Sequence, residues 1–268
     1  YIHVYTHARA HIHTHLRKFE TGMSTDEKKH EVVTSEEWLK ARMELLEEEK
    51  ALGRKLAALS AKRSALPWRA LPSPTYTFEP AHSPSTQVPL SHLFGKNSQL
   101  IVYHLMMGEE AEGPCQMCSY FIDQYMACIP HLSQRAAFAV VAKASASKLA
   151  EVAKTKGWTH LYSSSSSSSF NEDMGVSFTP EQMADAEGAP YNYGRRWRYG
   201  SEAPGLSVFA KDGEGNVYHT YSTFAAGLAT VPTLSLVHSL LDVTPEGRAE
   251  SGKHPMWWVK HKEEYEHE

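Results

Sequence analysis

The chain has 268 residues, a formal net charge of −4, 41% hydrophobic and 22% charged residues. These proportions are those of a globular protein with a sizeable core. The net charge lacks the excess of basic residues that a dedicated nucleic-acid-binding protein usually has. No run of apolar residues approaches the roughly 18 that a membrane-spanning helix needs. Three cysteines are too few for a secreted disulfide framework. We therefore expect a cytoplasmic protein, without nucleic-acid or membrane partners, built as one domain with attachments.

The first part of the chain differs from the rest. Histidines recur every four residues at His3, His7, His11 and His15. On a helix this spacing would make an imidazole stripe able to bind a metal. The segment holds few core residues, however, and a polar, start-like sequence follows Met23. We interpret residues 1–33 as a disordered or non-native extension, with residues 1–22 as translated upstream sequence or a tag. A transit peptide and a metal stripe are the alternatives.

A helical arm is expected over residues 34–66. Acidic residues follow Ser35, and apolar residues then recur every seven positions, at Trp38, Leu45, Leu52, Leu59 and Leu66. This pattern predicts one amphipathic helix from about Ser35 to Ala65. It either packs on its own domain or forms the seam of a homodimer. Residues 67–89 are rich in proline and are expected to form an extended connector, with a short edge strand at residues 76–78 inside it.

Residues 90–245 show an alternating α/β pattern. The apolar run 100–106 predicts a buried central strand, and 119–134 predicts a helix. A second strand at 136–142 and a second helix at 145–156 follow. This order predicts a parallel pair of strands with a right-handed crossover. Segments 206–211 and 217–223 predict a β-hairpin, residues 231–241 a final helix, and residues 246–268 a C-terminal tail.

Two of the cysteines form the motif Cys115-Gln116-Met117-Cys118 at the predicted junction of strand and helix. A two-residue spacer at a helix start brings two thiols within bridging distance. The free N–H groups and dipole of the helix lower the pKa of the first thiol, and the thiolate is the nucleophile. We therefore expect Cys115 to attack a disulfide and Cys118 to resolve the mixed disulfide. No cofactor is expected.

Two other interpretations of the pair remain open. A metal-dependent enzyme or metal carrier would use the cysteines with His104, although a zinc site normally needs a second ligand pair. In a non-catalytic scaffold or binding protein the cysteines would be structural. Cys128 lies inside the predicted helix and is expected in the core.

The stretch from about Val33 to Tyr265 resembles the DUF899 family of thioredoxin-like proteins, described as predicted dithiol-disulfide oxidoreductases. The resemblance rests on separated segments in the same order, including 35–38, 63–68, 98–104, 115–119, 170–178, 191–193, 204–209, 219–223 and 241–245. It implies a thioredoxin-like α/β fold with a long N-terminal helix and a C-terminal extension. It also implies a protein or small-molecule disulfide or thiol as substrate.

The thioredoxin-like fold further implies which residues surround the cysteines. A cis-proline before a strand faces the dithiol in such folds, and Pro204 occupies the corresponding place. His104 is expected near the cysteines as an acid–base group, with a hydrogen-bonded core histidine as the other interpretation. Asn171 and Asp173 are expected either to line a substrate site or to cap a loop.

Overall fold

The computed structural model describes residues 30–73, 75–165, 169–225, 227–228 and 234–266. The segment 1–22 and most of the predicted extension lie outside the described residues. The chain divides into two compact units, residues 1–60 and residues 61–268. The second unit contains the sheet and both cysteines of the motif.

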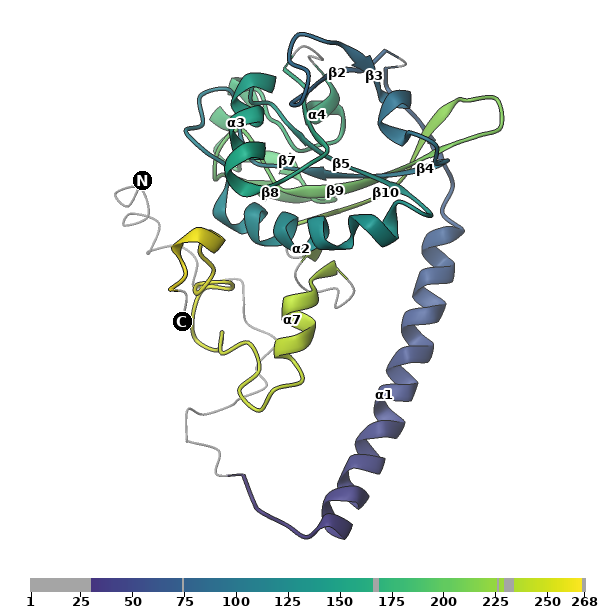
Figure 1. Cartoon of the computed structure of the whole chain (residues 1–268), viewed down its shortest axis with the longest axis vertical. Helices are drawn as coiled ribbons and strands as arrows, with labels where there is room; N and C mark the ends of the chain where they lie inside the picture. Colours follow the sequence, from purple (N-terminus) through teal and green to yellow (C-terminus); the bar gives the residue numbers. More distant parts are fainter. Residues whose placement is uncertain (1–29, 74, 166–168, 226, 229–233, 267–268) are drawn as a thin grey trace. The chain divides into compact units, whose positions relative to one another are not determined.

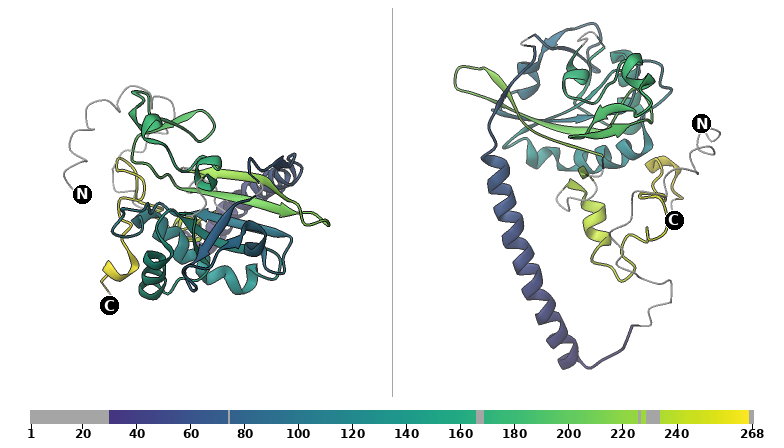
Figure 2. Two further views of the ribbon diagram at one scale, coloured as in Figure 1. Left: turned by 90° about the horizontal axis from the view of Figure 1, so that it is seen from above. Right: turned by 180° about the vertical axis from the view of Figure 1, so that it is seen from behind.

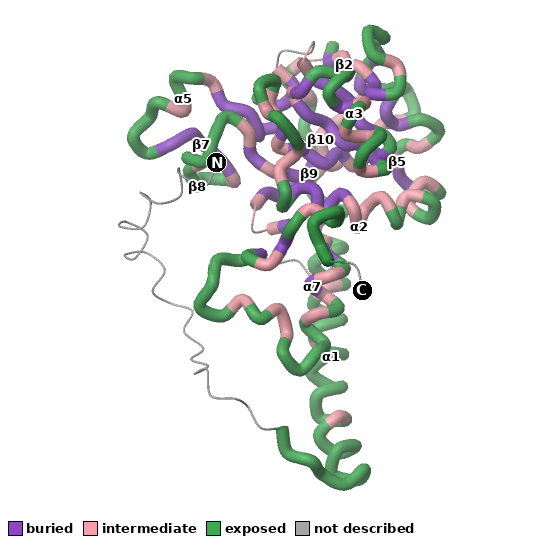
Figure 3. Tube along the Cα trace, turned by 60° about the vertical axis from the view of Figure 1, so that its left-hand side comes forward, coloured by how far each residue is buried: buried purple, intermediate pink, exposed green. Residues whose placement is uncertain are grey.

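The first unit contains most of helix α1, Ser35–Ser64, close to the helix predicted from the sequence. Its start is fixed by reciprocal capping, because the Glu37 carboxylate accepts from the Thr34 backbone N–H while the Thr34 hydroxyl accepts from the Glu37 N–H. Glu36 and Glu37 lie in the first turn and basic residues in the last, as the helix dipole favours. No residue of α1 is buried, and Figure 3 shows the helix as exposed along its length.

The second unit is organised around a mixed sheet. Within the described residues the sheet has eight strands in the order β1-β10-β9-β4-β5-β6-β2-β3. Strands β4, β5 and β6 run parallel, and β9 and β10 form the antiparallel hairpin predicted from the sequence. The bounds are β1 Arg69–Ala70, β2 Thr77–Pro80, β3 Val88–Pro89, β4 Gln99–His104, β5 Ala137–Ala142, β6 Leu161–Ser163, β9 Gly205–Lys211 and β10 Val217–Phe224.

The central order β10-β9-β4-β5, with β4 and β5 parallel and β9 and β10 antiparallel to their neighbours, is the arrangement of a thioredoxin-like fold. Helix α2, Gln116–Leu132, connects β4 to β5, and α3, Ala146–Lys156, connects β5 to β6. Since both crossovers step in the same direction across the sheet, both helices cover the same face. Figures 1 and 2 show α2 beneath that face.

The two faces of the sheet have separate cores. One core joins α2 and α3 to the sheet through residues such as Tyr103, Phe121 and Leu149. The other contains Phe78, Phe170 and Phe209 and is covered by shorter elements. These and the remaining elements are η3 Leu90–Phe94, α4 Phe170–Asp173, α5 Pro180–Ala184, β7 Ala189–Tyr191, β8 Arg195–Trp197, α7 Leu236–Leu241 and η5 Lys262–Glu264.

Several elements differ from the sequence prediction. Residues 67–89 contribute three strands to the sheet, β1, β2 and β3, of which only β2 corresponds to the edge strand predicted at 76–78. Their prolines are tolerated because Pro80 and Pro89 end short strands near the edge of the sheet. Helix α2 begins three residues earlier than predicted, so the cysteine motif belongs to its first turn.

Candidate functional site

Cys115 is the N-cap residue of α2, directly after the loop that leaves β4. Its backbone N–H donates to the Met106 carbonyl at 3.1 Å, which ties the start of the helix to the end of the central strand. The Ser119 N–H donates to the Cys115 carbonyl at 2.9 Å, and the Ser119 hydroxyl donates to it at 3.0 Å. Cys115 is half-buried, whereas Cys118 is 1% exposed, and the structure has both as free thiols.

The pKa values of the two thiols are shifted in opposite directions. A hydrogen bond from Cys118 lowers the pKa of Cys115, and the backbone N–H groups of Cys118 and Met117 lower it further, against the effect of burial. Burial raises the pKa of Cys118 well above its ordinary value, and its contact with Cys115 adds to this. The pair is therefore divided into an accessible thiolate and a shielded thiol, which suits attack by the first and resolution by the second.

Tyr103 belongs to the same core as Cys118, and burial together with the nearby Cys118 thiol raises the pKa of its hydroxyl. Successive side chains of a strand point to opposite faces. His104, the next residue of β4, consequently faces the other core, where its ring lies 5.9 Å from that of Phe170. The predicted proximity of His104 to the cysteines is not what the structure shows, because the sheet lies between them.

His104 instead begins a row of hydrogen bonds that crosses three strands, which we call the His–Ser row (His104, Ser207, Ser222, His219). The His104 Nε2 lies 2.8 Å from the Ser207 hydroxyl, which lies 2.8 Å from the Ser222 hydroxyl. The Ser222 hydroxyl lies 2.7 Å from the His219 Nε2. Burial lowers the pKa of His104 to about 3 and that of His219 to about 4, so both imidazoles are neutral near pH 7.

The His–Ser row depends on a β-bulge. Strand β10 is irregular between His219 and Tyr221, so Thr220 is an extra residue opposite β9. Without the extra residue, His219 and Ser222 would point to opposite faces. The bulge therefore brings the His219 ring within 2.7 Å of the Ser222 hydroxyl and completes the row.

Pro204 lies where the sequence places it, just before β9 and next to the end of β4, since Gly205 pairs with His104. The peptide bond before Pro204 is trans, and no cis bond occurs among the described residues. The expectation of a cis-proline is therefore wrong. The Pro204 carbonyl accepts a hydrogen bond from the Tyr191 hydroxyl, which fixes this loop to strand β7.

Asn171 and Asp173 lie in different surroundings. Asn171 is buried, and its side-chain oxygen accepts from the Ser164 hydroxyl at 2.9 Å. Its backbone carbonyl accepts from the N–H groups of Val176 and Ser177, so it organises the loop after α4. Asp173 accepts a 2.6 Å hydrogen bond from the Tyr76 hydroxyl and lines a pocket beside β10.

Sequence reasoning missed Glu202, which lies close to the loop after β4. Its carboxylate accepts from the Ser177 hydroxyl at 2.6 Å, and its side chain lies against Gly108. Burial raises the pKa of Glu202 to about 7, against the opposing effects of Ser177, Lys143 and Asn171. The residues around Glu202 in the sequence do not indicate that its side chain is buried. Its position depends on the isolated β-bridge between Ser177 and Glu202, which joins two segments distant in the sequence.

Cys128 is exposed on the later part of α2, and its thiol contacts the Gln124 carbonyl at 3.5 Å. The expectation that it is a core residue is wrong, because the apolar stripe of α2 passes through Phe121 and Ile122 and leaves position 128 on the outer side. Across the described residues no group of three or more His, Cys, Asp or Glu side chains could hold a metal.

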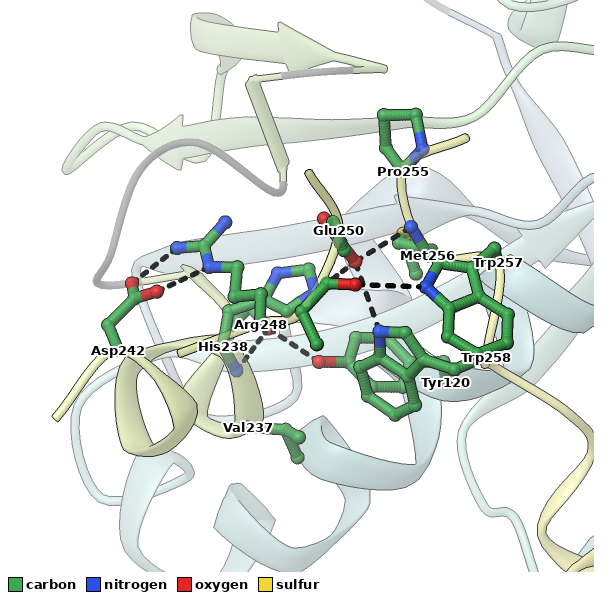
Figure 4. Close-up of polar contacts among 12 residues, drawn as sticks. Tyr120, Val237, His238, Asp242, Arg248, Glu250, Pro255, Met256, Trp257 and Trp258 are labelled. Carbon is green, nitrogen blue, oxygen red and sulfur yellow. Dashed lines mark hydrogen bonds and ion pairs between the residues drawn. The ribbon is translucent and has the colours of Figure 1, made fainter. Parts of the chain in front are cut away.

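The C-terminal segment covers the outer side of α2 near the cysteines. Met256 and Val259 are buried in the core that contains Cys118. The ring of Trp258 packs edge-on against that of Tyr120 at 5.7 Å, and its N–H donates to Glu250 at 3.1 Å. Figure 4 shows these contacts around Tyr120, two residues after Cys118. The tail predicted from the sequence thus packs against the first turns of α2.

The family model described as "Bacterial protein of unknown function (DUF899)" matches residues 27–265. The chain belongs to the DUF899 family. The match includes α1, every strand of the sheet and the segment that covers α2, so the cysteine motif lies well inside the DUF899 region.

No curated protein matches the sequence. Among solved structures, this DUF899 chain is similar to a peroxiredoxin Q from Xanthomonas campestris, with 12% identity, a TM-score of 0.43 and coverage of 64% of this chain and 96% of that one. It is also similar to the peroxidoxin BcpB from Mycobacterium tuberculosis, with 11% identity, a TM-score of 0.41 and coverage of 60% and 85%. No helix within the described part of the chain combines the length and apolar character needed to cross a bilayer.

Proposed function

We propose that the protein is a thiol–disulfide oxidoreductase that uses Cys115 and Cys118. The observation that carries the proposal is the division of the pair, with a half-exposed thiol of lowered pKa at a helix N-cap and a buried thiol of raised pKa one turn later. This division is what an attacking and a resolving thiol need at neutral pH.

In the proposed reaction the Cys115 thiolate attacks one sulfur of a substrate disulfide. The Cys115–substrate bond forms, the substrate S–S bond breaks, and the leaving thiolate takes up a proton. Cys118 then loses its proton and attacks the Cys115 sulfur, which releases the second substrate thiol. Two electrons have passed to the substrate, and the new Cys115–Cys118 disulfide is reduced again by an external dithiol.

The chemical class of substrate is a protein or small-molecule disulfide. The loop that contains Pro204 leads into β9 beside the end of β4, on the same edge of the sheet as the loop before Cys115. This loop therefore offers backbone groups close to the dithiol for a substrate to contact. The competing hypothesis is a scaffold in which the pair never turns over.

The test combines acidity with trapping. The alkylation rate of Cys115, followed against pH by mass spectrometry in a Cys128→Ser background, should have a midpoint well below the value of about 8.5 for a free thiol. Cys115→Ser should abolish disulfide reduction, and Cys118→Ser should accumulate a mixed disulfide at Cys115. Unchanged turnover in Cys115→Ser, or a midpoint above 8.5, would show that the pair is structural.

A further inference from the structure

A pocket with a volume of about 280 Å³ lies beside β10 on the sheet face opposite α2. The residues that decide its chemistry are Arg69, Asp173, Tyr191, Tyr193, His219 and Phe224. Neither cysteine of the motif lines it. The pocket opens on the other face of the sheet, and its wall residue Tyr191 reaches the Pro204 loop, where its hydroxyl donates to the Pro204 carbonyl.

Arg69 is the cation that this pocket presents. Arg69 pairs with His219 in the register of β1 and β10, so the two side chains share one face. Arg69 forms no ion pair with any residue that the structure describes. His219 is neutral near pH 7 because burial lowers its pKa to about 4. Asp173 is the opposite charge in the lining, and its carboxylate already accepts the Tyr76 hydroxyl at 2.6 Å. Arg69 is therefore the charged side chain of the lining that a ligand can pair with.

Three aromatic rings, those of Tyr191, Tyr193 and Phe224, form part of the wall. The rings of Tyr191 and Phe224 lie 5.4 Å apart, and those of Tyr193 and Phe224 lie 5.5 Å apart, in edge-to-face arrangements. Aromatic walls with a few placed polar groups are the usual lining of small-molecule sites. These rings suit a flat apolar body of modest size.

The turn that carries Tyr193 is strained. Asn192, Tyr193 and Gly194 have φ values of 49°, 56° and 103°, and a positive φ is costly for a tyrosine. Tyr193 is nevertheless 80% exposed, while its hydroxyl donates to the Ser222 carbonyl at 3.1 Å. These residues form the turn of the β7–β8 hairpin, which accounts for the positive φ values and holds the Tyr193 ring at the rim of the pocket.

We propose that this pocket binds a small carboxylate with a flat apolar body, the carboxylate on Arg69 and the body against Tyr191, Tyr193 and Phe224. The guanidinium group is the side chain best shaped to bind a carboxylate through two hydrogen bonds. This binding is separate from the dithiol, so Cys115→Ser should bind the same ligand.

Two probes of matched shape and opposite charge test the proposal. Phenylacetate and benzylamine are titrated into the full chain by calorimetry. Phenylacetate should bind saturably, about tenfold or more tightly than benzylamine. Arg69→Gln should remove the preference, whereas Arg195→Gln, on exposed β8 outside the lining, should keep it. Equal binding of both probes, preference for the amine, or no saturable binding of either would overturn the proposal.

A second variant separates ligand binding from folding. Tyr193→Gly removes the ring and also removes the strain of a positive φ. It should weaken phenylacetate binding severalfold while the thermal midpoint of unfolding stays the same or rises. Unchanged affinity in Tyr193→Gly with a raised midpoint would show that the strained turn serves folding alone, and the proposed pocket would be wrong.

Discussion

The two faces of the sheet place neighbouring residues of β4, Tyr103 and His104, in different chemical surroundings. On one face, Tyr103 contacts the buried thiol of Cys118 beneath α2. On the other, His104 starts the His–Ser row that ends at the pocket beside β10. The dithiol face places an ionisable group at a helix end, where N–H groups stabilise a charge. The other face keeps its two histidines, His104 and His219, neutral by burial and joins them through serine hydroxyls.

This difference teaches that a buried titratable residue near a redox motif in sequence need not belong to the motif's chemistry. His104 follows Tyr103 directly, yet a pleated strand sends the two side chains to opposite sides. The faces should therefore respond independently to substitution, and the following changes test that independence.

The largest effect is expected from Phe170→Ala. Phe170 is fully buried, and its ring lies 4.8 Å from that of Phe78 and 5.1 Å from that of Tyr76. Removing it should lower the free energy of unfolding by about 3–5 kcal/mol, measured by urea denaturation. The pH midpoint of Cys115 alkylation should not move under native conditions. A shifted midpoint would show that the two faces are coupled.

The second largest effect is expected in the pH dependence of stability, through His104. His104 has a folded pKa of about 3, against 6.5 for the unfolded chain. Below pH 6.5 the His104 imidazole binds a proton in the unfolded chain but not in the folded chain, so the free energy of unfolding falls as the pH falls. The slope approaches about 1.4 kcal/mol per pH unit for this one group. His104→Gln should reduce the slope between pH 6.5 and 4, measured by denaturation at several pH values. An unchanged slope would mean that His104 is not buried as the neutral form.

Glu202→Gln should act in the opposite direction. The folded pKa of Glu202 is about 7, above its ordinary 4.5, so between these values the folded chain holds a proton that the unfolded chain releases. Stability contributed by this group therefore falls as pH rises through that window. At pH 8 the glutamine variant should be more stable by about 1–3 kcal/mol. Glu187→Gln, at an exposed position, is the control and should have no such effect. A Glu202→Gln variant that loses stability at pH 8 would contradict the raised pKa.

The smallest effect is expected from Cys128→Ser. The side chain is exposed and its weak contact with the Gln124 carbonyl can be made by a hydroxyl. The change in unfolding free energy should stay within about 0.5 kcal/mol. Disulfide reduction by the variant should equal that of the unchanged chain. A marked loss of reduction would indicate a third thiol in the reaction.

Local patterns predicted much of this architecture. The apolar run 100–106, the cysteine motif after it and the hairpin around 206–223 correspond to β4, the start of α2, and β9 with β10. Each depends on periodicity or on turn residues within one stretch of chain. The same is true of α1, where the capping residues and the charge gradient lie within the helix itself.

Features that depend on register could not be read in this way. Thr220 looks like any strand residue, yet as a bulge it turns His219 and Ser222 to one face. The pairing of Arg69 with His219 joins positions 150 residues apart in the sequence. The trans bond before Pro204 and the burial of Glu202 likewise follow from tertiary contacts, since neighbouring residues do not determine them.

The short outer strands of the sheet have a consequence for self-association. Strands β1 and β3, at the two ends of the strand order, are two residues long each, and β3 ends in Pro89, which has no N–H to donate. Long open edges are where chains add strands to one another and aggregate. The two end strands therefore offer little backbone to another chain, whereas β10 continues for several residues beyond its pairing with β1. Any self-association by strand addition is expected at that uncovered part of β10.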